Sequence, residues 1–184
     1  MRSLTAVVLF FIPALALAEI PQTFNNMTFG QPPEVDMICT RGPCSTNSIR
    51  PDVKQNKIEM SYYVRPADIT TYGNWEISTP RYMFYKDKFF RVIFDIICDD
   101  IDSQRCIDET VEKLSQEYEL ETLYDLSTED EDFAVQKRSY SVGSDTKVSI
   151  TQVTKRSNFQ RPFVTIENNS LLAAAQKDAR EKHQ

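Results

Sequence analysis

The strongest structural pattern in the chain lies at residues 81–98, where two apolar runs flank a short polar turn. In the second run, alternate positions are apolar: Phe90, Val92, Phe94, Ile96 and Cys98. Alternation of this kind is typical of a strand with one buried face. Lys86-Asp87-Lys88, between the two runs, predicts a tight hairpin turn. The pattern therefore predicts a central antiparallel hairpin, and a helix has to cover its apolar face.

Residues 103–118 are predicted to form that helix. Ile107, Val111, Leu114 and Tyr118 are spaced four, three and four residues apart, which places them along one stripe. Asp102 or Ser103 can cap the start of the helix. We expect this amphipathic helix to pack centrally on one face of the sheet.

The remaining patterns predict further strands and two terminal helices. Strands are expected at 57–64, 71–78, 133–142, 146–154 and 162–167. Residues 120–124 are expected to form a short strand or an extended connection, before an acidic loop at 128–132. A shift of the apolar phase predicts a bulge near Lys137-Arg138. Helices are expected at residues 34–39, before the Gly42-Pro43 stop, and at residues 170–183. The order predicts an α+β fold with an antiparallel β-sheet of about six to seven strands, a central amphipathic helix packed on one face, and short N- and C-terminal helices.

The first eighteen residues are predicted to be a secretory signal peptide. Arg2 supplies a positive start, residues 4–15 are almost wholly apolar, and Ala16-Leu17-Ala18 provides the small residues that precede a cleavage site. We expect residues 1–18 to be removed and residues 19–184 to form a single α+β domain. No other segment approaches the ~20 apolar residues that a membrane-spanning helix needs. The mature protein is therefore expected to be exported and soluble, in the periplasm or outside the cell.

Export makes the four cysteines candidates for disulfide bonds. They are Cys39, Cys44, Cys98 and Cys106. Four cysteines allow three pairings, and the sequence does not choose among them. Pairing 39 with 44 and 98 with 106 is the simplest, because each bond closes a short turn. The chain has no C-x-x-C motif and no His near any Cys. These absences favour structural disulfides over a redox dithiol or a metal site.

Charge is distributed unevenly along the chain. The net charge is −6 and the pI is about 4.9, which argues against a general nucleic-acid-binding protein. Residues 117–132 contain eight acids and no base, whereas residues 133–161 contain one acid and six bases. The bases are Lys137, Arg138, Lys147, Lys155, Arg156 and Arg161. This basic hairpin could bind a protein or an anionic component of the cell envelope. Alternatively, the acidic connection folds back over the hairpin, and the cations discourage pairing at strand edges.

The sequence offers little for catalysis. Its only His, His183, is next to the last residue, where chains usually fray, so we do not expect a Ser-His-Asp or Cys-His arrangement. Four Gly leave no room for a Gly-rich phosphate loop. We therefore expect a non-enzymatic, partner-binding protein without a cofactor. An envelope hydrolase or inhibitor that uses carboxylates is the alternative from another class.

Two other groups of residues have both a functional and a structural interpretation. Asp99, Asp100 and Asp102 could bind Ca²⁺ through their oxygens, although capping of the following helix explains the same acids. Aromatic side chains are dense between residues 62 and 90: Tyr62, Tyr63, Trp75, Tyr82, Phe84, Tyr85, Phe89 and Phe90. They could line a ligand groove, but such rings more often form the core and flanks of a sheet. We expect the core role.

Two segments carry a family resemblance. Phe29-Gly30, the following Pro-Glu-Val segment and Gly42-Pro43 are similar to the opening of BamE/SmpA-like modules, in which a helical element precedes a β-meander. Residues 82–92 and the helix after them resemble small exported bacterial proteins of unknown function, whose helix ends in Tyr-Gly. Leu114 and Tyr118 fit that helix, but Glu119 replaces the Gly, and the lipid-anchor Cys of BamE is missing. The resemblance implies an exported α+β protein.

Overall fold

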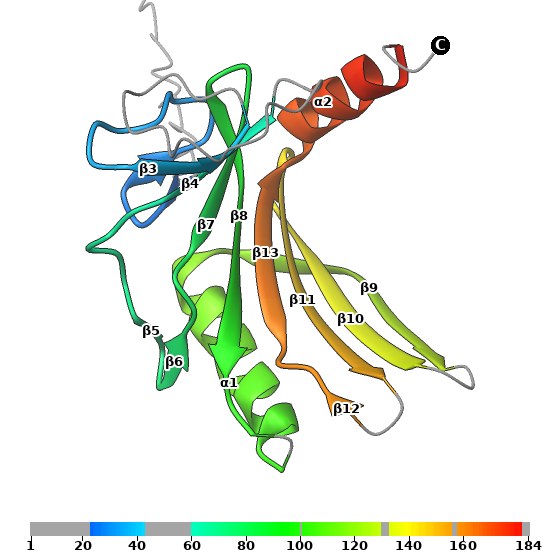
Figure 1. Cartoon of the computed structure of the whole chain (residues 1–184). Coiled ribbons are helices and arrows are strands. Elements are labelled where there is room, and N and C mark those ends of the chain that lie inside the picture. The colour runs from blue at the N-terminus through cyan, green and yellow to red at the C-terminus, as the bar shows by residue number, and fades with distance from the viewer. Residues whose placement is uncertain (1–22, 43–59, 100, 130–132, 156–157, 182–184) are drawn as a thin grey trace, which may run out of the picture.

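A computed structural model describes residues 23–42, 60–99, 101–129, 133–155 and 158–181. Within these ranges, eleven strands form one antiparallel sheet (Figure 1). Its main path runs β3 (Ile38–Arg41), β4 (Met60–Val64), β7 (Arg81–Tyr85), β8 (Lys88–Ile97), β13 (Phe163–Asn168), β11 (Thr146–Lys155), β10 (Phe133–Val142) and β9 (Leu120–Glu129). Three short strands flank this path: β5 (Thr71–Tyr72), β6 (Trp75–Ile77) and β12 (Asn158–Phe159). A separate hairpin pairs β1 (Thr23–Phe24) with β2 (Met27–Thr28).

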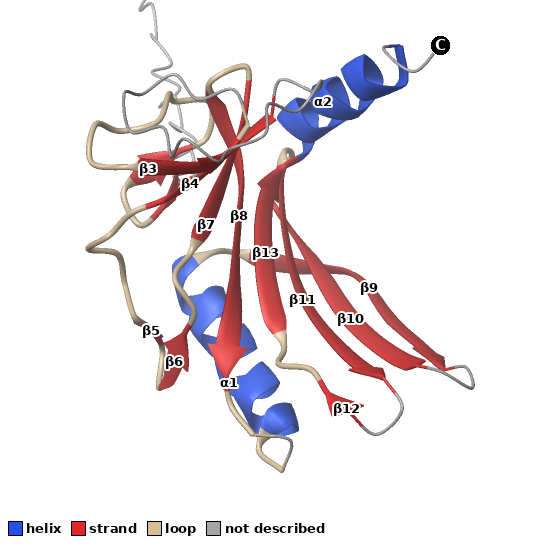
Figure 2. Ribbon diagram, in the orientation of Figure 1, coloured by secondary structure: helices blue, strands red, loops and turns tan. Residues whose placement is uncertain are grey.

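The described residues contain two helices, which lie in different parts of the molecule (Figure 2). α1 (Ser103–Glu117) buries Ile107 and Leu114 in the main core with Val92 and Phe94 of β8. α2 (Asn169–Glu181) follows β13 and packs Ala175 in a second, smaller core with Met83, Tyr85 and Phe90. The two helices therefore serve separate cores.

The predicted fold class is wrong. The structure is mostly antiparallel β-sheet, with more strands than the six or seven expected and without the expected N-terminal helix. Where that helix was expected, Ile38 and Cys39 instead lie in β3, opposite Val64 and Tyr63 of β4. A short apolar run fits either a helix or a strand, and here pairing with a neighbouring strand decides.

The central hairpin and the span of the amphipathic helix were predicted correctly, but the expected α+β arrangement around a central helix is wrong. β7 occupies residues 81–85, and α1 ends one residue before the expected boundary. Lys86 and Asp87 both have positive φ, +48° and +57°, as a two-residue type I′ hairpin turn requires. Five of the eight aromatic residues singled out in the sequence are fully buried: Tyr63, Tyr82, Phe84, Phe89 and Phe90. The core interpretation of these rings is confirmed.

A bulge divides the predicted apolar face of β8. Met83 of β7 pairs with Arg91, but the next residue, Phe84, pairs with Phe89, so Phe90 is the extra residue. An extra residue reverses the side-chain alternation on one side of the bulge. Phe89 therefore joins the α1 core, while Phe90 joins the α2 core. The prediction that Phe90 shares a face with Val92 is wrong. The two faces of the hairpin at this point therefore belong to different cores.

The bulge expected near Lys137-Arg138 does not form in β10; the extra residue lies on the neighbouring strand β9 instead. β10 pairs with β11 in continuous register, but its pairing with β9 shifts between Ser139 and Tyr140. Leu123 of β9 is the residue left without a partner at this shift. The acidic segment that contains it was expected to be a short strand or an extended connection at residues 120–124, followed by a loop at residues 128–132. It is instead the ten-residue strand β9 at the end of the sheet.

Replacing Leu114 with Ala should remove a central contact between α1 and the sheet. Leu114 is 0% exposed, so the truncation leaves a cavity and should lower the free energy of unfolding by about 2–5 kcal/mol, measured by urea denaturation. Leu123→Ala is the matched control, because Leu123 is 50% exposed and its truncation should cost about 0.5 kcal/mol or less. Equal losses in the two variants would contradict the position of α1.

Candidate functional site

The Cys98–Cys106 disulfide connects the end of β8 to the first turns of α1. The two Cα atoms are 6.6 Å apart. Cys39 is buried and also disulfide-bonded, whereas Cys44 and the predicted signal peptide lie outside the described residues. The 39–44 pairing therefore stays a prediction. Within the described ranges no cysteine is free, so these residues offer no thiol chemistry.

The acidic turn before α1 is organised by its backbone. The Asp102 amide donates a hydrogen bond of 3.2 Å to the Asp99 carbonyl oxygen. Asp102 occupies the N-cap position, but its side chain makes no capping hydrogen bond, contrary to one of the two expected caps. The Asp102 carboxylate instead lies 3.6 Å from Arg105. Asp100 falls outside the described residues, and the described ones contain no group of three acids, His or Cys arranged to hold a metal.

Arg138 of the predicted basic hairpin connects three elements of the fold. Its Nη1 lies 2.7 Å from Oδ1 of Asp108 on α1, and its Nε lies 3.6 Å from Oδ2 of Asp125 on β9. Hydrogen bonds from Gln104 and Arg138 lower the pKa of Asp108, and the Asp108 carboxylate raises the pKa of Arg138. The guanidinium is therefore used to join the helix to the edge of the sheet.

Lys147 is also engaged by β9, but on the opposite face of the sheet. Its Nζ donates a hydrogen bond of 3.1 Å to the Tyr124 hydroxyl and lies 5.1 Å from the centre of the Tyr124 ring. Hydrogen bonds from Ser139 and Lys147 lower the pKa of Tyr124. Arg138 and Lys147 thus fit the alternative that the acidic segment folds back over the hairpin.

The structure does not gather the other predicted cations into one patch with these two. Lys137 is half-buried beside Leu126 of β9, on the face opposite Arg138, and Arg161 is exposed in the segment before β13. Arg156 and the side chain of Lys155 are outside the described part of the chain. The described cations of the hairpin therefore lie on two faces of the sheet.

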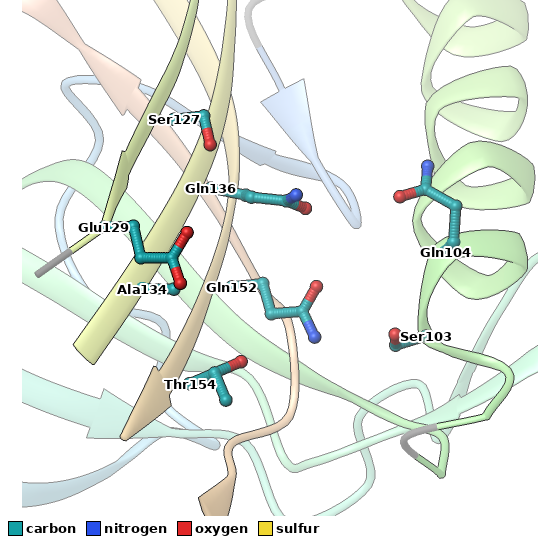
Figure 3. A pocket seen from close by; sticks show the side chains of 8 residues that line it. All are labelled: Ser103, Gln104, Ser127, Glu129, Ala134, Gln136, Gln152 and Thr154. Atoms are coloured by element: carbon teal, nitrogen blue, oxygen red, sulfur yellow. The ribbon is translucent and has the colours of Figure 1, made fainter. Parts of the chain in front are cut away.

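A polar cleft of about 320 Å³ lies between α1 and the outer strands, and we call it the amide cleft. Figure 3 shows Gln104 of α1 facing Gln136 of β10 and Gln152 of β11 across the gap. The lining residues are Ser103, Gln104, Ser127, Glu129, Ala134, Gln136, Gln152 and Thr154. An adjoining hollow of about 210 Å³ shares Gln104, Ser127 and Gln136 and adds Asp125 and Arg138. The shared residues place the two hollows next to each other.

The cleft begins where the apolar core ends along the same face of the sheet. On β11, Val148 and Ile150 are buried in the core, but the next residues on that face, Gln152 and Thr154, are polar. Primary amides offer both hydrogen-bond donors and acceptors. Apart from Ala134, every described residue that lines the cleft carries a polar or charged side chain. Sequence reasoning missed this site; the available signal was the change from apolar to polar residues after Ile150.

β9 forms one wall of the cleft and is also an edge of the sheet. In the described part of the chain it pairs with β10 alone, and every residue except Leu120 is exposed. Three large hydrophobic side chains on it are exposed: Leu123 by 50%, Tyr124 by 39% and Leu126 by 44%. Its pairing with β10 is regular from Tyr124 to Glu129. Ser127 and Glu129 point to the cleft side.

The chain matches no protein family, no curated protein and no solved structure in the comparisons made with each. Neither α1 nor α2, the helices of the described residues, is long and apolar enough to cross a membrane.

The Arg138–Asp108 contact should make stability depend on pH in a predictable way. The pKa of Asp108 is lowered from its ordinary 3.8 in the folded state. The ionised carboxylate therefore contributes its full stabilisation of the folded state above pH 3.8, and this stabilisation is lost as the pH falls through the lowered pKa of the folded protein. Asp108→Asn should therefore unfold more easily than the parent protein at pH 7. We expect a loss of about 1 kcal/mol or less, because the pair is partly exposed.

Urea unfolding of the two proteins at pH 7, 4 and 2 checks this dependence. The difference between them should shrink as the pH falls below the ordinary pKa of the carboxyl group. A difference that stays constant down to pH 2 would show that the negative charge of Asp108 is not the cause.

Proposed function

We propose that this protein is an exported, non-enzymatic binding protein that holds a protein partner by strand addition at β9. In strand addition, an extended peptide of the partner pairs with the open edge of a sheet through main-chain hydrogen bonds. The observation that carries the proposal is that β9 is a ten-residue edge strand paired only with β10 among the described residues. Export is supported by the predicted signal peptide and by the Cys98–Cys106 disulfide.

The composition of β9 supports this role. An edge strand presents a row of unpaired N–H and C=O groups, and such edges are usually short or well protected. In the described ranges five large hydrophobic side chains are exposed, and three of them lie on β9: Leu123, Tyr124 and Leu126. A partner strand would cover these side chains while its backbone pairs with the edge.

The geometry gives no comparable support to the hydrolase alternative. A pair of catalytic carboxylates has to approach the same substrate bond from different directions. The acids of the cleft, Asp125 and Glu129, lie four residues apart on one strand, and Asp125 already faces Arg138. The resemblance to BamE/SmpA-like modules stays a prediction and adds only the expectation of an exported protein.

Backbone methylation of a peptide probe tests strand addition directly. An extended octapeptide of Thr, Val, Ser and Lys should bind the full chain, measured by fluorescence anisotropy of a label on the peptide. Alternate residues of an added strand face the sheet edge. N-methylation of one alternate set should therefore abolish binding, and N-methylation of the other set should leave it nearly unchanged.

The two methylated peptides control for each other, since they have the same composition and number of methyl groups. If both methylated peptides bound like the parent peptide, or if both sets of N-methyl groups weakened binding equally, strand addition would be wrong. Self-association of the protein in sedimentation, lost in the Leu126→Lys variant, would instead assign the edge to a second copy of the chain.

A further inference from the structure

The open edge of β9 and the amide cleft are adjacent, so a strand added to β9 has one row of side chains over the cleft. Ser127 and Glu129 of β9 line the cleft, and Asp125 lines the adjoining hollow. Successive side chains of a strand point to opposite faces, so alternate residues of the added strand would project on this side. Leu126 lies between these residues in sequence and points to the other face.

The cleft side of β9 carries an excess of negative charge. Its described charged groups are the carboxylates of Asp108, Asp125 and Glu129, against the guanidinium of Arg138. Arg138 contacts Asp108 at 2.7 Å and Asp125 at 3.6 Å, so Asp125 is partly neutralised. Glu129 has no ion pair within the described residues, which makes it the stronger attractor for a cation.

The amides of the cleft add acceptors around this carboxylate. Gln104 uses its Nε2 to donate a hydrogen bond of 2.9 Å to Asp108, and this leaves its carbonyl oxygen open. Gln136 and Gln152 make no side-chain hydrogen bond to another described residue. A lysine ammonium has three donors and an arginine guanidinium has five, and neither has an acceptor. Amide carbonyl oxygens beside a carboxylate suit such a group.

We propose that the amide cleft binds a Lys or Arg side chain of the partner strand, opposite Glu129, and that a second basic residue four positions away lies opposite Asp125. In an antiparallel addition, the partner segment then has the pattern basic, any, small polar, apolar, basic. The small polar residue lies opposite Ser127, and the apolar residue lies opposite Leu126. This inference rests on the proposed strand addition and specifies its partner as a basic extended peptide.

Charge favours such a peptide over a second copy of this chain. A second β9 would place acids near Asp125 and Glu129, and like charges directly opposite each other destabilise strand pairs. The chain also carries a net charge of −6, which disfavours self-association through an acidic edge. A partner segment with basic residues on one face avoids both sources of repulsion.

A set of peptides tests the pattern with the full chain. The probe contains Lys-Thr-Ser-Val-Lys within an octapeptide otherwise made of Thr and Val. A first control replaces both Lys with norleucine, which removes the charge but keeps the alkyl stem. A second control moves only the second Lys by one position, so that the two Lys point to opposite faces and no register places both over the cleft. Anisotropy titrations should give the tightest binding for the probe, and its affinity should fall with added salt.

Variants of the protein locate the charge effect on one face of β9. Glu129→Gln should weaken binding of the Lys probe about two- to fivefold, and Asp125→Asn should weaken it less because Arg138 already faces that carboxylate. Glu121→Gln is the matched control, since it removes the same charge from the same strand. Glu121 lies on the opposite face, where its carboxylate accepts a hydrogen bond from Ser141, and its loss should leave the affinity nearly unchanged.

The outcomes separate this inference from strand addition itself. Suppose that the norleucine and Lys peptides bound equally, while N-methylation of only one alternate set of residues still abolished binding. The edge would then accept strands without selecting for charge, and this inference would be overturned. Equal weakening by Glu121→Gln and Glu129→Gln would overturn it as well, since the effect would then come from net charge. Loss of binding by every peptide would overturn the proposed function with it.

Discussion

An antiparallel sheet that does not close on itself has to expose the backbone of its terminal strands, and here one terminal strand is β9. This constraint determines the functional surface more than any single side chain does. β9 cannot satisfy its outer N–H and C=O groups within the described structure, because its only pairing partner there is β10. Its acids and the irregular pairing at Leu123 limit uncontrolled pairing, as natural edge strands commonly do. These features leave the regular segment Tyr124–Glu129 as the part of the edge suited to a partner.

β9 is connected to α1 through Arg138, and α1 is in turn connected to β8 by a disulfide. The Cys98–Cys106 disulfide fixes the start of α1 to β8, and Arg138 joins Asp108 of α1 to Asp125 of β9. Along β11 the apolar core ends at Ile150, and the next side chains on the same face of the sheet are polar. A binding surface on such a connected framework loses little conformational freedom when a partner arrives.

The central hairpin and α1 could be predicted from sequence because their apolar periodicities are long and regular. β3 could not, since a run of a few apolar residues near Ile38 fits a helix as well as a strand. The length of β9 was missed for a different reason. An edge strand exposed on both faces has no buried side, so its sequence lacks alternation, and its acids suggested a loop. The split of Phe89 and Phe90 between two cores depends on a bulge, which is set by pairing between strands.

The candidate site was accessible from sequence only in part. The acidic and basic blocks were visible, but their contact through Asp125 and Arg138 depends on strand register. That register turns two of the predicted binding cations, Arg138 and Lys147, toward groups within the fold. It also assembles the amide cleft from Gln104, Gln136 and Gln152, which lie far apart in the chain and share no sequence motif.

Amide hydrogen exchange at β9 tests the central claim most directly. With a saturating basic peptide present, the backbone amides between Tyr124 and Glu129 that point outward from the edge should exchange more slowly. The amides of β3, at the other edge of the sheet, should exchange at an unchanged rate. The same measurement without peptide gives the reference rates. Bound peptide that leaves every β9 amide unchanged would contradict strand addition at this edge.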